Sequence, residues 1–267
     1  MLALGTILTA IVTPFRVSDG AVDAEAFVEI LHHVLSTGSD GVVVCGSTGE
    51  AATLSDEEHL RLIELAIAER PVGTTVVAST GSNDTRHAVS LTERATALGP
   101  DAILSVTPYY VRPSRRGLLR HYEAVARATD RPVLLYNIPS RTAIDVPNDL
   151  LAELAQIDHI EGVKQANHDS LALIDGLDVY AGNDDMLADT LDLGGAGGIM
   201  VASHVAGPLM RRMVDEPDHR RAIDAELTPL FEALSVTVRV TVCGPAPPKV
   251  WLEVTPVLVD PSPKAQA

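Results

Sequence analysis

Lysine is nearly absent from this sequence, although positive charge is not. The 267 residues include seventeen arginines but three lysines, Lys164, Lys249 and Lys264. Lys249 lies in a proline-rich stretch and Lys264 near the end, whereas Lys164 ends an apolar run in the segment IEGVKQAN (160–167). Arginine keeps its proton at neutral pH, but a desolvated lysine can become a neutral, nucleophilic amine. A general need for positive charge therefore does not explain Lys164.

Other scarcities exclude whole classes of protein. The two cysteines, Cys45 and Cys243, are too few for a disulfide framework and form no CxxC zinc motif, so we expect buried thiols in a reducing compartment. The net charge of −16 excludes nucleic acid as a partner, because phosphate binding needs a basic surface. No apolar run is long enough to cross a membrane. The N-terminal stretch lacks the basic start of a signal peptide and is interrupted by Pro14, so we expect a cytoplasmic protein without a membrane partner.

Short apolar runs, bounded by Gly, Pro and Asp, alternate with longer amphipathic segments. Most of these runs are apolar throughout, which is typical of parallel strands covered on both faces. The eight runs are 6–12, 41–46, 74–79, 101–106, 132–137, 160–164, 177–182 and 197–202. Eight strand–helix units in about 210 residues predict a TIM (β/α)8 barrel. A doubly wound sheet is the alternative, but no GxGxxG motif follows the first strand.

The amphipathic segments predict the helices and the domain organisation. Helical spacing covers 23–38, 55–70, 84–99, 114–130 and 184–195, and Ser55 with Glu58 forms a capping box. Two further helical stretches, roughly 204–214 and 217–235, precede a tail rich in valine and proline. We therefore expect a catalytic barrel over residues 1–203 and a C-terminal helical region over 204–267 with an atypical, shortened tail.

The residues that follow the predicted strands are candidates for a functional site. In a (β/α)8 barrel, chemistry lies at the carboxyl ends of the strands. The candidates there combine hydroxyls, one amine and one arginine, namely Ser47, Thr48, Tyr109, Tyr110, Tyr136, Arg141 and Lys164. His168 and His204 are too scattered to be ligands, so we expect no metal. Each candidate also has a structural interpretation: lysine as a surface charge, tyrosine as a cap on the core, and Arg141 as the partner of a surface acid.

The combination fits one kind of chemistry. A desolvated amine attacks a ketone to give an imine, and the imine acidifies the neighbouring carbon, so that an enamine forms and attacks an aldehyde. A chain of hydroxyls, Tyr–Ser–Tyr, can carry the protons. The glycine-flanked Ser47–Thr48 turn offers backbone N–H groups and hydroxyls to the carboxylate of a small keto acid.

The chain resembles the dihydrodipicolinate synthase / N-acetylneuraminate lyase superfamily of class I, pyruvate-dependent aldolases. The resemblance runs from about residue 10 to about residue 235. It rests on GSTGE (46–50), TPYYVRPS (107–114), LLYNIPSRT (134–142), GVKQA (162–166) and the AGNDD…LGGAGGIM segment (181–200).

The resemblance implies roles for eight residues. Lys164 would form the Schiff base with pyruvate, and Tyr136 would donate and accept protons beside it. Ser47 would join Tyr136 to Tyr110, which would reach in from a neighbouring subunit of a homotetramer or homodimer. The substrate-binding residues would be Thr48, Arg141, Gly182 and Ile199. No cofactor is implied beyond the covalent lysine imine.

Arg141 decides between subfamilies. In the synthases of the superfamily this arginine binds the carboxylate of aspartate 4-semialdehyde, so the resemblance implies condensation of that aldehyde with pyruvate in lysine biosynthesis. Two alternatives remain open. One is an aldolase for a sugar-acid aldehyde such as that released from 2-keto-3-deoxygluconate, which would need hydroxyl partners in place of Arg141. The other is a non-catalytic homologue, which the presence of Lys164, Tyr136 and Ser47 argues against.

Several positions depart from the family pattern. Ser47 stands where many synthases have threonine, KQANHDS (164–170) lacks the usual acidic residue after the lysine, and CGPAPPKVWLEV (243–254) only echoes the usual C-terminal stretch. The positions that match the family's lysine-feedback pocket are Ala51, Asp56, His59, Asn83 and His87. His87 replaces a glutamate that grips the ammonium group of the effector, so we expect weak or absent inhibition by lysine.

Overall fold

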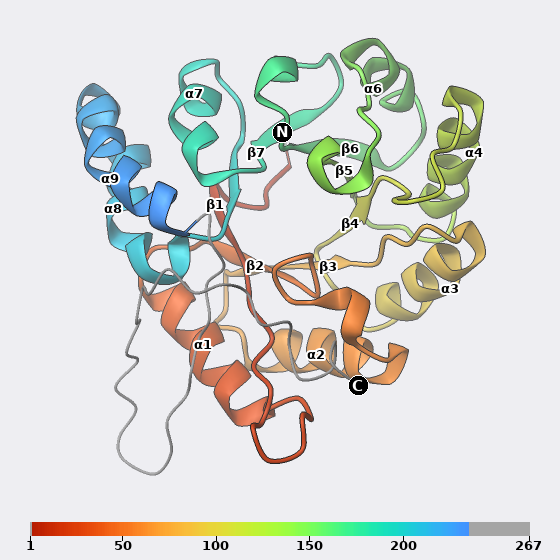
Figure 1. The fold of residues 1–267 in the computed structure, drawn as a ribbon, viewed down its shortest axis with the longest axis horizontal. Coiled ribbons are helices and arrows are strands. Elements are labelled where there is room, and N and C mark those ends of the chain that lie inside the picture. The colour runs from red at the N-terminus through yellow and green to blue at the C-terminus, as the bar shows by residue number, and fades with distance from the viewer. Residues whose placement is uncertain (1, 235–267) are drawn as a thin grey trace.

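Eight parallel strands form a closed barrel in the order of the sequence, β1 to β8, in the computed structural model of the chain. The structure describes residues 2–234. Figure 1 shows the strands at the centre of the molecule and the helices around them. The strands are β1 (Ile7–Ala10), β2 (Gly41–Val44), β3 (Thr75–Ser79), β4 (Ala102–Val106), β5 (Val133–Asn137), β6 (Ile160–Gln165), β7 (Asp178–Ala181) and β8 (Gly197–Met200). All eight lie within or overlap the predicted runs, so the predicted (β/α)8 barrel is confirmed.

The strands are apolar throughout because both of their faces are buried. On β4, for example, Ala102 and Leu104 face the barrel interior, whereas Ile103 packs in the layer between strands and helices. The interior is filled by apolar side chains from seven of the eight strands, including Tyr136 and Tyr180, and by Ala166 just after β6. The barrel is thus a packed core, and room for a substrate exists only at its ends.

The predicted helices form, five of them between successive strands and two after β8. Helix α2 begins with the predicted capping box, in which the Ser55 hydroxyl accepts from the Glu58 N–H and the Glu58 carboxylate accepts from the Ser55 N–H (2.9 Å). The other long helices of the ring also pack their apolar faces onto the strands. The predicted segments correspond to α1 (Ala24–Ser36), α2 (Asp56–Glu69), α3 (Thr85–Thr96), α4 (Arg115–Ala126), α7 (Leu187–Asp192), α8 (Ser203–Asp215) and α9 (Arg220–Leu234).

Three connections differ from the sequence prediction. Two short helices, α5 (Pro139–Thr142) and α6 (Asn148–Leu154), link β5 to β6, and neither is long enough to show a helical period. A 3-10 turn (His168–Ser170) is the only helical element between β6 and β7. The predicted 184–195 helix is a 3-10 turn followed by the six-residue α7.

Helix α9 packs against the outside of the barrel, beside α8 (Figure 1). It buries Ile223, Leu227 and Phe231. Its Arg221 forms ion pairs with two residues of α7, Asp189 (2.7 Å) and Asp192 (2.6 Å). No helix within residues 2–234 is both long and apolar enough to cross a membrane. The predicted atypical tail lies outside the described residues, and the predicted division between 1–203 and 204–267 stays a prediction.

Buried His204 connects the segments that directly follow β1 and β8, the first and last strands of the barrel. The Val12 N–H, just after β1, donates to His204 Nε2 (3.3 Å), and His204 Nδ1 donates to the Val201 carbonyl just after β8 (2.8 Å). These partners fix a neutral imidazole, since protonation of Nε2 would remove the acceptor for Val12. Burial lowers the pKa of His204 to about 4.

We expect this histidine to make the protein sensitive to acid. The unfolded chain binds a proton near pH 6.5 but the folded chain only near 4. The contribution of His204 is therefore complete above about pH 6.5 and is lost as the pH falls toward 4, by roughly 3 kcal/mol. Urea unfolding at about pH 7.5 and about pH 4.5 measures this loss. His204→Gln should show the smaller decline, and exposed His32→Gln should match the wild type; equal declines in all three would contradict the assignment.

Candidate active site

Lys164 and Tyr136 face each other at the carboxyl ends of β6 and β5. They are register partners in the barrel, and both side chains point to its interior. Lys164 is 4% exposed and Tyr136 is 5% exposed, and the Lys164 Nζ lies 4.4 Å from the centre of the Tyr136 ring. Burial of Lys164 contradicts the interpretation of this lysine as a surface charge.

The environment of Lys164 favours its neutral form. Burial lowers the pKa of the amine to about 8; Asp184 raises it and Arg141 lowers it further. Loss of hydration is the largest of these effects because an ammonium group is costly to hold away from water. A useful fraction of Lys164 is therefore an uncharged nucleophile close to neutral pH.

The environment of Tyr136, in contrast, favours the protonated form of its phenol. Burial raises the pKa of its phenol to about 12, and this exceeds the lowering effects of Arg141 and of a hydrogen bond with Ser47. The phenol therefore keeps its proton at neutral pH and can donate it. Ser47 thus lies near enough to Tyr136 to affect the pKa of its phenol, and its predicted role as a link in a chain of hydroxyls stays a prediction.

The turn that carries Ser47 and Thr48 is held in a fixed conformation after β2. Cys45 before it and Glu50 after it both have left-handed backbone angles, with φ of 56° and 54°. The Thr13 hydroxyl, just after β1, donates to the Gly49 carbonyl (2.7 Å), and a side chain at position 49 would approach the backbone within 3.0 Å. Anchored in this way, the turn presents the two hydroxyl residues at the barrel mouth.

Gly182 and Ile199 lie on the neighbouring strand ends. Gly182 donates its N–H to the Gln165 carbonyl (2.7 Å), and a Cβ at position 182 would lie 2.7 Å from that of Ala166. The end of β7 can thus approach β6 only with glycine at this position. Ile199 is fully buried in the barrel interior on β8.

Tyr110, Arg141 and Ser47 are exposed, unlike the other predicted site residues. Tyr110 is 88% exposed and has a left-handed φ of 69°, as does Arg112 two residues later, with φ of 44°. Its ring therefore projects away from the single chain, and the structure does not bring it to Ser47. Arg141 follows Pro139 in α5, is exposed, and acts electrostatically on both Lys164 and Tyr136.

Asp184 is a residue of the site that the sequence interpretation missed. It follows β7, and its carboxylate accepts N–H bonds from Val201 (2.8 Å) and Ala202 (2.9 Å) while attracting the charge of Lys164. Burial raises its pKa, and these bonds and Lys164 oppose that rise. The available signal was the pair of acids in AGNDD, directly after a strand. Asp184 supplies a counter-charge to a cation on Lys164.

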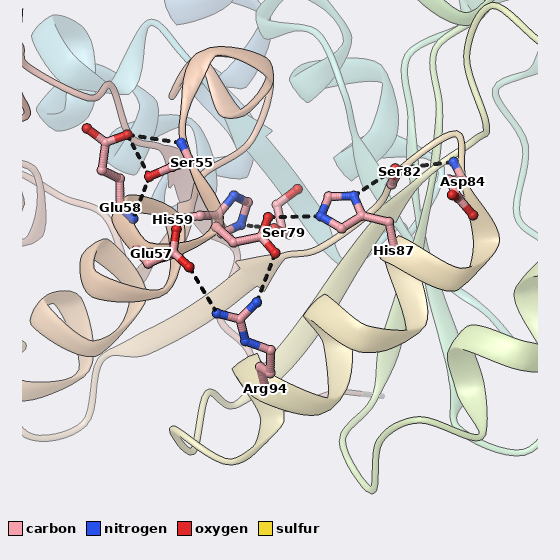
Figure 2. Close-up of polar contacts among 10 residues, drawn as sticks. Ser55, Glu57, Glu58, His59, Ser79, Ser82, Asp84, His87 and Arg94 are labelled. Atoms are coloured by element: carbon pink, nitrogen blue, oxygen red, sulfur yellow. Dashed lines mark hydrogen bonds and ion pairs between the residues drawn. The ribbon is translucent and has the colours of Figure 1, made fainter.

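Three of the positions that match the feedback pocket, Asp56, His59 and His87, lie in a separate cluster between α2 and α3 (Figure 2). His87 bonds through Nε2 to Asp56 (2.9 Å) and through Nδ1 to Ser82 (3.1 Å). Arg94 donates to the second oxygen of Asp56 (2.8 Å), and buried His59 bonds to the Ser79 carbonyl (2.7 Å). Ala51 and Asn83 flank this cluster in the chain. Asp56 is thus already paired, and its pKa is lowered chiefly by the bond with His87.

No metal site accompanies these residues in the described part of the chain. Among residues 2–234, no group of three or more histidine, cysteine, aspartate or glutamate side chains is arranged to hold a metal ion. The thiol of Cys45 is buried and bonds to the His59 carbonyl (3.6 Å), and burial raises its pKa well above the usual range. Cys243 lies outside the described residues.

The fold and the site together define a (β/α)8-barrel protein with a desolvated amine beside a phenol at its mouth. A sequence profile described as the dihydrodipicolinate synthetase family matches residues 3–255, and the chain belongs to this family. This confirms the resemblance inferred from the motifs, and as a member of a synthase family the chain is an enzyme.

Relatives of known name agree with this assignment. The chain is 40% identical to the 4-hydroxy-tetrahydrodipicolinate synthase of Syntrophus aciditrophicus, over 88% of this chain and 84% of that one. It is 38% identical to 4-hydroxy-tetrahydrodipicolinate synthase 2 of Halalkalibacterium halodurans, over 86% and 82%. The crystal structure of DHDPS from Cyanidioschyzon merolae with lysine bound superposes with a TM-score of 0.82 at 34% identity, over 89% and 85% of the two chains.

Proposed function

We propose that this protein condenses pyruvate with aspartate 4-semialdehyde to give 4-hydroxy-tetrahydrodipicolinate, as a lyase of the diaminopimelate branch of lysine biosynthesis. The observation that carries the proposal is the burial of Lys164, with a pKa lowered to about 8, against the ring of Tyr136. The names of the relatives favour this aldehyde over a sugar-acid aldehyde. The reaction needs no metal or organic cofactor, because the amine itself activates the ketone.

The reaction begins when the neutral Lys164 Nζ adds to the C2 carbonyl of pyruvate. The carbinolamine loses water to become a protonated imine, and loss of a C3 proton from the imine gives the enamine. Carbon C3 of the enamine then attacks the aldehyde carbon, and the resulting alkoxide takes up a proton. The amino group that came with the aldehyde adds to the imine carbon and closes the ring, and the bond from that carbon to Nζ breaks, so that Lys164 is released as a free amine and the cyclic product leaves. Tyr136, as a protonated phenol, supplies protons in these steps, and Ser47 and a neighbouring subunit's Tyr110 connect it to solvent. Asp184 stabilises the positive charge of the imine.

The other predicted residues bind the two carboxylates. Thr48 and the backbone of its turn hold the carboxylate of pyruvate, while Gly182 and the Ile199 carbonyl line the same pocket. Arg141 binds the carboxylate of the aldehyde, and its place on the short helix after Pro139 restricts the directions in which it can reach. The predicted homotetramer or homodimer and the cytoplasmic location belong to the same proposal.

Borohydride trapping tests the proposal directly. The protein is incubated with pyruvate, reduced, weighed intact by mass spectrometry and then mapped. A single adduct on Lys164 supports the mechanism. Folded protein that gains no adduct contradicts it and favours the non-catalytic homologue, whereas turnover of glyceraldehyde but not of the semialdehyde favours the sugar-acid aldolase.

Arg141→Leu should separate binding of the aldehyde from chemistry on pyruvate. Loss of a charge-assisted bidentate contact should raise KM for aspartate 4-semialdehyde by roughly 10- to 100-fold. Trapping of pyruvate should stay close to wild type at about pH 9, where Lys164 is largely neutral with or without the nearby arginine. Steady-state kinetics with each substrate varied in turn measures both effects. Arg127→Leu, at the C-cap of the outer helix α4, is the matched control. An unchanged KM in Arg141→Leu would refute the role.

Lysine should inhibit this enzyme weakly or not at all. An effector ammonium would need a free carboxylate, and Asp56 is already engaged by His87 (2.9 Å) and Arg94 (2.8 Å). Initial rates measured over a range of lysine concentrations test this expectation. Inhibition by sub-millimolar lysine would contradict it.

A further inference from the structure

Two amide side chains lie directly behind Tyr136 and Lys164. Asn137 and Gln165 are the next residues on β5 and β6, and they too are register partners. Because successive side chains on a strand point to opposite faces, this second pair faces the surrounding helices while the first pair faces the barrel interior. Both amides are buried, with 0% and 1% of their surfaces exposed.

Hydrogen bonds join these amides to each other and to the next loop. Asn137 Nδ2 donates to Gln165 Oε1 (3.0 Å) and to Asp145 Oδ1 (2.8 Å), while Asn137 Oδ1 accepts from the Val146 N–H (3.1 Å). Gln165 Oε1 also accepts from the Asn167 N–H (3.1 Å). A carboxylate only accepts and a backbone N–H only donates, so the orientation of both amides is determined.

Asn137 thereby connects three parts of the site. Through Gln165 it holds β6 at the residue next to Lys164, and its own backbone continues from Tyr136. Through Asp145 it holds the segment that begins with α5, four residues after Arg141. Asp145 is held on its other side by the Ser170 hydroxyl (3.3 Å).

We propose that Asn137, Gln165 and Asp145 form a positioning network for this active site, resting on the proposed function above. The hydrogen bond from Asn137 to Gln165, here called the Gln165 arm, sets the distance between Lys164 and Tyr136. The hydrogen bond from Asn137 to Asp145, the Asp145 arm, holds the segment that presents Arg141. The network touches no substrate. The network affects the rate because it holds the reacting groups in place, and a displacement of those groups by about 1 Å can slow a reaction on the order of 100-fold.

The Gln165 arm is tested without the aldehyde. Exchange of the methyl protons of pyruvate with deuterium, followed by NMR, reports enamine formation and so depends on Lys164 and Tyr136 together. Gln165→Met removes the acceptor but keeps the length of the side chain. It should slow exchange by roughly 10-fold or more, with KM for pyruvate changed less than about threefold. Thr92→Val is the matched control, because it removes a buried bond to the end of β3 (2.7 Å) far from the pair.

Gln165→Glu separates positioning from folding. It keeps both accepted hydrogen bonds, so exchange should return to within about threefold of wild type at its best pH. Its added negative charge lies beside Lys164, while Asp184 and Arg141 are unchanged, so the pH of half-maximal imine formation should rise. A Gln165→Met variant that exchanges as fast as Thr92→Val, or a Gln165→Glu variant that is no faster than Gln165→Met, would overturn the proposal.

The Asp145 arm should give a different result. Asp145→Ala leaves the bond between Asn137 and Gln165 in place, so exchange should stay within about threefold of wild type while KM for aspartate 4-semialdehyde rises by roughly 10-fold. A slowed exchange with an unchanged KM would overturn this division of roles. Wild-type protein that traps no pyruvate would instead refute the proposed function, so the two failures are distinguishable.

Discussion

Lys164→Arg is expected to abolish trapping of pyruvate and to lower kcat/KM by roughly 10³-fold or more. Arginine preserves a positive charge at the end of β6, but its guanidinium cannot lose a proton at neutral pH and cannot form an imine. Lys164→Met tests the same loss without burying a charge, and circular dichroism establishes that each variant is folded. A borohydride adduct that persists in these variants would place the nucleophile elsewhere.

The pH dependence of trapping follows from the environment of Lys164. Its pKa is lowered to about 8, and the neutral amine is the reactive form. The rate of imine formation should therefore rise with pH, reach half of its maximum near 8 and level off above it. Rapid mixing with pyruvate and borohydride across this range measures the midpoint. A midpoint near 10.5, the ordinary value for lysine, would mean that the amine is not desolvated when it reacts.

Tyr136→Phe is expected to lower kcat by roughly 10²- to 10⁴-fold, the usual contribution of a positioned general acid. The ring and its packing against Lys164 remain, so trapping of pyruvate should still reach completion, although more slowly. Steady-state kinetics and intact mass separate these two effects.

Tyr122→Phe is the matched control for that substitution. It also removes a buried phenol, one that donates to Thr107 (3.0 Å) behind the strands, and should leave kcat within about threefold of wild type. A Tyr136→Phe enzyme as active as this control would show that protons travel by another route.

Much of the barrel could be predicted because its strands are buried on both faces. Such strands are continuous apolar runs, and in a parallel barrel each one is separated from the next by a helix or a long connection. The order of elements then fixes the closed sheet, and the carboxyl ends of the strands identify the mouth. Lys164 could be singled out because the chain otherwise uses arginine for positive charge.

The residues that could not be predicted depend on contacts between distant parts of the chain. Asp184 acts on Lys164 across β6 and β7, and the sequence shows only two adjacent acids after a strand. Asn137 and Gln165 look like ordinary polar ends of apolar runs, and their bond appears only once the register of β5 and β6 is known. Helices α5 and α6 are shorter than the window in which a helical period is visible.

The scarcity of lysine around Lys164 in the sequence has a practical consequence for digestion with trypsin. Lys164 is the only lysine among residues 2–234, and the flanking arginines are Arg141 and Arg211. Trypsin therefore cuts the segment between them at one point only, after the proposed nucleophile. Once reduced pyruvate occupies the amine, that cut should be blocked, and residues 142–211 should be released as one uncut peptide. A digest of the enzyme would thus record the fraction of sites that had carried substrate, because the covalent chemistry of the site removes a cleavage point.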